Sequence, residues 1–191
     1  MTLLILGLIV FLAAHSVRIY AEPWRGAVMA RIGPNAWKGL YSLVSLLGFV
    51  LIVWGYGRAR VGAAELWSSP SWLHNPALLL MLLSFILFAA VYVPHNRIKT
   101  VIGHPMVASV VVWASAHLLT NARAADLVLF GAFLAWSAID FRSSRRRDRL
   151  AGTDAPAGTW ANAAVAAVIG LAVWVLFLIY LHSRLIGVPV I

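Results

Sequence analysis

Two histidines lie inside long apolar segments, where an ionisable ring is costly and is usually present for a function. His117 follows an uncharged run that begins at Met106, and His15 lies near the end of the apolar segment that opens the chain. Neutral imidazole is the commonest metal ligand among side chains, so two such rings on different helices could hold one metal between them. The plainer alternative is ordinary helix packing, with each ring hydrogen-bonded to a neighbouring carbonyl group.

The residues around His117 are spaced so that they share one face of a helix. Four semi-polar residues recur at every fourth position and therefore line up along the helix: Ser109, Trp113, His117 and Asn121. Positions 108 and 114–116 carry only alanine and serine, which permits close helix contact or the close approach of a flat ligand. Trp113 is therefore a candidate cofactor-binding residue beside His117.

The elements that must position these rings are membrane-spanning helices. The chain has 191 residues, of which 62% are hydrophobic and only 11% charged, more apolar surface than a water-soluble domain of this size needs. We predict an all-α, polytopic transmembrane helical bundle of about six spans that forms one domain over residues 1–191. Some spans are slightly shorter than the ~20 residues that cross a bilayer, a mismatch that local thinning can absorb. The spans are predicted at about residues 3–20, 37–56, 76–93, 105–121, 126–141 and 160–182.

The net charge of +9 is large, but its distribution favours a membrane topology over a nucleic-acid partner. Eleven of the 15 Lys and Arg residues lie in the first, third and fifth loops. The positive-inside rule therefore places these loops in the cytoplasm and both termini outside. The basic run Arg142–Arg149 is interpreted as an anchor against anionic headgroups. The lipid bilayer is the expected partner, and no nucleic acid is expected.

Five fragments, taken in order, resemble the NnrU family of bacterial membrane proteins, which is associated with denitrification. The same domain is similar to plant zeta-carotene isomerase, and the resemblance covers nearly the whole chain. It implies a multi-pass protein of the bacterial inner membrane, and the loop charges then place both termini in the periplasm. The fragments are Ala14–Arg18, Gly103–Pro105, Trp113–Asn121, Ala125–Gly131 and Leu181–Pro189.

The resemblance implies a haem b held between His15 and His117. The chain has no cysteine, so such a haem would be bound non-covalently. One departure from the isomerase is Ala114, which stands where the plant protein has a cysteine, so a mechanism that needs thiolate ligand exchange is in doubt. Arg18 lies one turn beyond His15 on the same helix face and is the candidate partner of a haem propionate, because a guanidinium binds a carboxylate with two parallel hydrogen bonds.

The depth of each histidine in the membrane gives a separate view of the ligand pair. His104 lies about 20 Å from His117 along their common helix, and His15 lies about 21 Å from the outer end of its own. His15 is then expected in the cytoplasmic half of the membrane and His117 in the outer half. A tilted haem tolerates this offset. His104 near His15, or His182 near His117, fits the depths better, so both are kept as reserve ligands.

Two functions remain open at this point. The first is a haem protein with redox, isomerase-like or nitrogen-oxide-linked chemistry, and its substrate could be an apolar polyene. Because two histidine ligands leave no open iron site, catalysis would require one of them to leave. The second is a cofactor-free membrane factor that assists the maturation or regulation of nitrite and nitric oxide reductases. The sequence does not decide whether the protein is an enzyme or forms a homo-oligomer.

Overall fold

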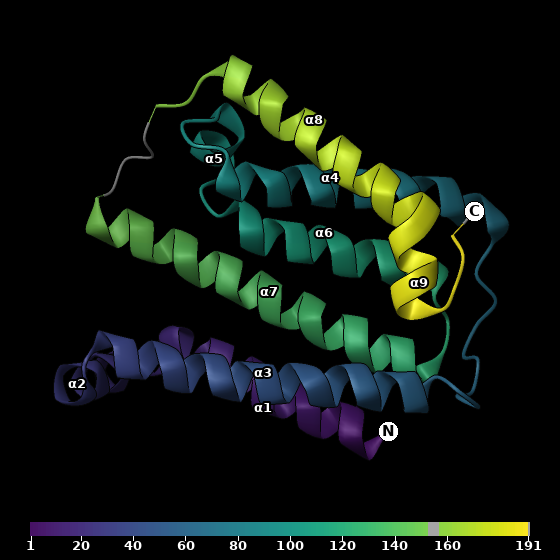
Figure 1. The fold of residues 1–191 in the computed structure, drawn as a ribbon, viewed down its shortest axis with the longest axis horizontal. Coiled ribbons are helices and arrows are strands. Elements are labelled where there is room, and N and C mark those ends of the chain that lie inside the picture. Colours follow the sequence, from purple (N-terminus) through teal and green to yellow (C-terminus); the bar gives the residue numbers. More distant parts are fainter. Residues whose placement is uncertain (153–156, 191) are drawn as a thin grey trace.

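The computed structural model describes residues 1–152 and 157–190, and the long elements in this part of the chain are all helices (Figure 1). Among the described residues, five helices are long and apolar enough to cross a membrane, and α6 is a shorter apolar helix. The prediction of an all-α membrane bundle with about six spans is confirmed. The elements are α1 (Thr2–Tyr20), α2 (Glu22–Ile32), α3 (Pro34–Ala59), η1 (Ser71–Leu73), α4 (His74–Tyr92), α5 (Arg97–Ile102), α6 (Pro105–Thr120), α7 (Ala124–Ala151), α8 (Trp160–Leu176), the π-helical turn η2 (Phe177–Leu181) and α9 (His182–Ile186).

Two helical regions differ from the sequence-based expectation. The first loop contains α2, a short helix that is not apolar and begins with a proline in its first turn. The fifth loop is mostly helix, because α7 continues through the basic run Arg142–Arg149 and stops only at Gly152, whose left-handed backbone ends the helix. Hydropathy marks where a helix leaves the membrane, not where it ends, and for that reason the predicted span 126–141 was shorter than α7.

The bundle has two distinct ends. The connections α1–α3, α4–α6 and α7–α8 lie at the same end, together with α2, α5 and the last turns of α7 (Figure 1). This end carries most of the Lys and Arg residues, and we call it the basic end. The opposite end holds the two chain ends, the α3–α4 connection and the turn between α6 and α7 (Figure 1).

Glycines allow a close helix contact between α1 and α3. A Cβ atom at Gly48 would lie 2.7 Å from the backbone nitrogen of Phe11, and one at Gly7 would lie 2.6 Å from that of Ile52. Only glycine lets the two backbones approach this far, which is a common solution for membrane helices. Gly48 therefore fixes α1 at Phe11, one turn before His15.

Candidate functional site

His15 lies near the basic end of α1, and its ring is held by its own helix. Its Nδ1 donates to the carbonyl oxygen of Phe11 at 2.8 Å, and its ring stacks on the Phe11 ring at 4.1 Å. Tyr41 of α3 and Trp136 of α7 flank the imidazole, with ring centroids 5.2 and 5.8 Å away. Because a carbonyl can only accept, Nδ1 carries the proton and Nε2 keeps its lone pair. This is the tautomer of most metal-binding histidines.

His117 repeats this arrangement on α6. Its Nδ1 donates to the carbonyl oxygen of Trp113 at 3.0 Å, and its ring stacks on Phe130 of α7 at 4.5 Å. The Nε2 lone pair is therefore available here as well. A structural histidine in a helix makes the same hydrogen bond, so this geometry alone does not separate a ligand from a packed side chain.

His15 and His117 differ in their position relative to a cavity of about 880 Å³. It lies at the basic end, and His15, Arg18 and His104 are among the residues of its wall. The residues described for this wall do not include Trp113, His117 or His182. Aromatic side chains form much of the lining: Phe11, Trp37, Tyr41, Phe133 and Trp136. The charged residues of the wall are Arg18, Arg25, Lys38, Lys99, Arg147, Asp140 and Asp148.

Aromatic rings lie between the cavity and His117. Phe133 lies 5.8 Å from Phe11 on the His15 side and 5.6 Å from Trp113 on the His117 side. Trp113 in turn lies 5.2 Å from His117. The structure therefore does not bring the two histidines of the resemblance into one open space. It joins them through a continuous layer of packed aromatic side chains.

Contacts with α7 give the relative levels of the histidines. His15 contacts Trp136, and His117 contacts Phe130. These α7 positions are six residues apart, which is about 9 Å along the helix. His104 bonds Asp148, twelve residues from Trp136 and thus about 18 Å along α7. Measured along α7, His117 is therefore nearer to His15 than His104 is. The depth estimated from helix rise alone had instead favoured His104 as the ligand paired with His15.

At the opposite end of the bundle, hydrogen bonds join α3 to the start of α7. The Tyr56 hydroxyl donates to Oδ1 of the buried Asp126 at 2.6 Å, and the Arg123 backbone N–H donates to Oδ2 at 3.1 Å. Asp126 thus caps the start of α7. The Nδ1 of His182 donates to the carbonyl oxygen of Val188 at 2.7 Å.

The cavity has more cationic groups than anionic ones. Arg25 pairs with Glu22 at 2.9 Å, Arg147 lies 3.9 Å from Asp140, and Asp148 bonds His104 at 2.7 Å. Three further cations of the wall have no ion pair with any carboxylate in the described part of the chain: Arg18, Lys38 and Lys99. The cavity is therefore suited to an anionic ligand.

Some residues of the wall were not identified from the sequence, and Trp136 is the most informative. Its indole Nε1 is buried and has no hydrogen-bond partner among the described residues. A sequence signal existed, because positions 133, 136, 140, 144 and 147 are spaced by three or four and share one face of α7. That spacing could not show that the face borders a cavity.

The cavity fits a haem at His15. The aromatic side chains of its wall suit the porphyrin, and the Nε2 lone pair of His15 suits the iron. The cations that have no ion pair in the described part of the chain suit the two carboxylates of a haem. In residues 1–152 and 157–190 no group of three or more His, Cys, Asp or Glu side chains could hold a bare metal ion. A haem needs fewer protein ligands, because its porphyrin supplies four.

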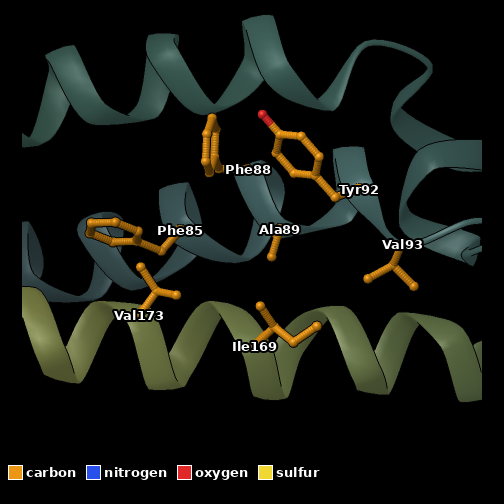
Figure 2. Close-up of a pocket in the computed structure, with 7 residues that line it drawn as sticks. All are labelled: Phe85, Phe88, Ala89, Tyr92, Val93, Ile169 and Val173. Atoms are coloured by element: carbon orange, nitrogen blue, oxygen red, sulfur yellow. The ribbon is translucent and has the colours of Figure 1, made fainter.

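A second hollow, between α4 and α8, holds none of the predicted site residues (Figure 2). Its volume is about 220 Å³. Phe85 and Ala89 of α4 and Ile169 and Val173 of α8 point into the gap between the two helices, whereas the Tyr92 hydroxyl points away from α8 (Figure 2). This wall offers a ligand apolar contact but no charge, so the cavity at His15 is the candidate site.

Comparison with known proteins gives one match. The family model described as NnrU protein matches residues 3–190, nearly the whole chain. No curated protein and no solved structure matches it.

Proposed function

The chain belongs to the NnrU family, and from this premise we propose that it is an integral membrane protein that binds haem b in the cavity at its basic end. His15 is the proposed axial ligand. The observation that carries the proposal is the position of His15 in the wall of a cavity lined by aromatic rings and cations. Its Nδ1 donates to the Phe11 carbonyl, which leaves the Nε2 lone pair for the iron. Three of the cations, Arg18, Lys38 and Lys99, have no ion pair with a carboxylate in the described part of the chain. A bound haem would supply one-electron chemistry or an iron centre for small gases.

His117 is the proposed second ligand, and this part rests on the resemblance to the plant isomerase. Two observations support it: the Nδ1 hydrogen bond to the Trp113 carbonyl, and a level about 9 Å from that of His15 along α7. His104 and His182 stay in reserve. Because His117 lies behind Phe133 and Trp113, its loss should alter the coordination of the iron more than the occupancy of the cavity.

The proposed location is the bacterial inner membrane, with the basic end in the cytoplasm and both termini in the periplasm. The gathering of eleven of the 15 Lys and Arg residues on the loops of one end supports this orientation. Arg18 and its neighbours then lie at the level of the cytoplasmic headgroups. These cations would bind the propionates of a haem.

The test is the visible spectrum of the full-length protein, purified in detergent from haem-replete cells, with and without dithionite. We expect a sharp Soret band and low-spin visible bands that sharpen on reduction. Colourless protein that takes up no haem on titration would contradict the proposal. That result would favour the cofactor-free factor that assists nitrogen-oxide reductases.

A further inference from the structure

The hollow between α4 and α8, here called the α4–α8 groove, opens on the outer surface of the bundle (Figure 2). Phe88 and Ile169 line it and are exposed, and in a membrane such apolar surface faces the lipid chains. From Phe85 to Val93 the groove follows α4 for about 12 Å, close to half of the ~30 Å hydrocarbon core. Its volume of about 220 Å³ is below the ~300 Å³ of the smallest pockets that enclose a whole small molecule. The groove therefore suits part of a chain that runs along one leaflet.

Polar groups and a cation lie directly beyond the groove at the basic end. The Asn162 side-chain amide donates to the Pro94 carbonyl oxygen at 3.0 Å, and the Arg97 backbone N–H donates to the Thr159 carbonyl oxygen at 3.1 Å. These bonds join the chain after α4 to the first turn of α8. The Arg97 guanidinium carbon lies 5.9 Å from the ring centroid of Trp160, which is 74% exposed. An exposed tryptophan at the end of a span is typical of the membrane–water interface.

The charge of Arg97 has no anionic partner in the described part of the chain. No carboxylate there forms an ion pair with it, and the sequence has no acidic residue between Glu65 and Asp126. A guanidinium forms two parallel hydrogen bonds with a phosphate group. Basic sites between membrane helices at the headgroup level are a known way of binding anionic lipids. The apolar groove and the cation at its end therefore match the two parts of one lipid.

We propose that the α4–α8 groove binds an acyl chain of a phospholipid with a net negative headgroup, and that the phosphate of this lipid pairs with Arg97. The chain lies against Ala89, between the side chains of α4 and those of α8 (Figure 2). A zwitterionic lipid makes the same apolar contacts but gains less from Arg97, because its headgroup also carries a cation. The described walls of the groove and of the cavity at His15 have no residue in common, so the lipid site does not depend on haem.

The experiment measures lipid binding to the full-length protein in detergent by native mass spectrometry. The two probes are phosphatidylglycerol and phosphatidylcholine with the same oleoyl chains. Arg97→Gln removes the charge and keeps a polar side chain. Arg58→Gln is the matched control, because Arg58 also lies over a tryptophan ring, 5.8 Å from Trp54, but at the opposite end of the bundle.

A second pair of variants tests the groove itself. Ala89→Leu places a larger side chain in the groove. Ala172→Leu is its control, because Ala172 is exposed on α8 and is not among the residues of the described groove wall. The same two lipid probes are used, and the mass spectra also report whether the protein is a monomer or a dimer.

We expect phosphatidylglycerol to bind the wild type more tightly than phosphatidylcholine. Arg97→Gln should raise the dissociation constant of phosphatidylglycerol about tenfold, the effect of losing one hydrogen bond to a charged group, and Arg58→Gln should leave it unchanged. Ala89→Leu should weaken the binding of both lipids, and Ala172→Leu of neither. Phosphatidylglycerol binding that neither Arg97→Gln nor Ala89→Leu weakens would overturn the inference. A wild-type dimer that Ala89→Leu dissociates would also overturn it and would make the groove an interface between two copies.

Discussion

His15 and His117 make the same hydrogen bond to the carbonyl group four residues earlier, and each stacks on an aromatic ring. Their surroundings differ. The ring of His15 borders a cavity of about 880 Å³ with unpaired cations, whereas that of His117 lies against Trp113 and Phe130 in a closely packed layer. The helix sets the tautomer in both cases. The packing of the neighbouring helices decides which ring borders the cavity.

The difference shows what an intramembrane histidine does and does not reveal. A buried imidazole needs a partner, which can be a carbonyl group four residues away or a metal. Burial alone therefore marks both histidines as candidate ligands and does not distinguish between them. Eleven of the 15 Lys and Arg residues, which could neutralise an anionic ligand, lie at the His15 end. We infer that the cavity at His15 would hold the haem, and that His117 would affect the coordination of the iron more than the binding of the haem.

The largest effect is expected from a change that displaces α1 at the His15 end. In Gly48→Val, the new Cβ would lie 2.7 Å from the Phe11 backbone nitrogen, and a backbone atom cannot move aside as a flexible side chain can. We expect a loss of about 1–3 kcal/mol in the free energy of unfolding, the usual cost of overpacking, together with weaker haem binding. Denaturant unfolding in detergent, followed by far-UV circular dichroism, measures it.

Gly57→Val is the matched control, because it lies on the same helix and a Cβ there meets no atom within 4 Å. Both substitutions carry the same change in helix propensity. Equal losses for the two variants would show that the contact between α1 and α3 does not position His15.

A smaller effect is expected from Arg18→Ala. Arg18 lines the cavity one turn beyond His15 and has no ion pair in the described part of the chain. Removing one charge-assisted contact should raise the dissociation constant for haem by about tenfold, without changing the spin state. Arg58→Ala is the control, because Arg58 lies at the opposite end of α3, 5.8 Å from the Trp54 ring. A Soret titration that gives the two variants the same affinity would remove Arg18 from the site.

The fold was largely predictable, because apolar length and loop charge report directly on membrane spans. The short helix α2 and the extension of α7 to Ala151 were not, since neither changes the hydropathy pattern. The close contact at Gly48 was also hidden, because a glycine in one helix does not say which backbone it faces.

The candidate site was predictable in part. Residue type and spacing identified His15 and Arg18, which line the cavity, and also His117 and Trp113, which do not. The two pairs look alike in sequence, since both are helical neighbours in apolar segments. Trp136 was missed because its place in the cavity wall arises only once the helices have packed.

The anchoring role of His15 is tested most directly by the haem content and visible spectra of His15→Ala and His117→Ala, purified side by side from haem-replete cells. The account predicts that His15→Ala contains almost no haem, because the cavity loses its iron ligand. It predicts that His117→Ala keeps most of its haem, because the cavity and its cations remain, and that its low-spin spectrum becomes high-spin. A His15→Ala protein with full haem content, beside an empty His117→Ala protein, would contradict the account.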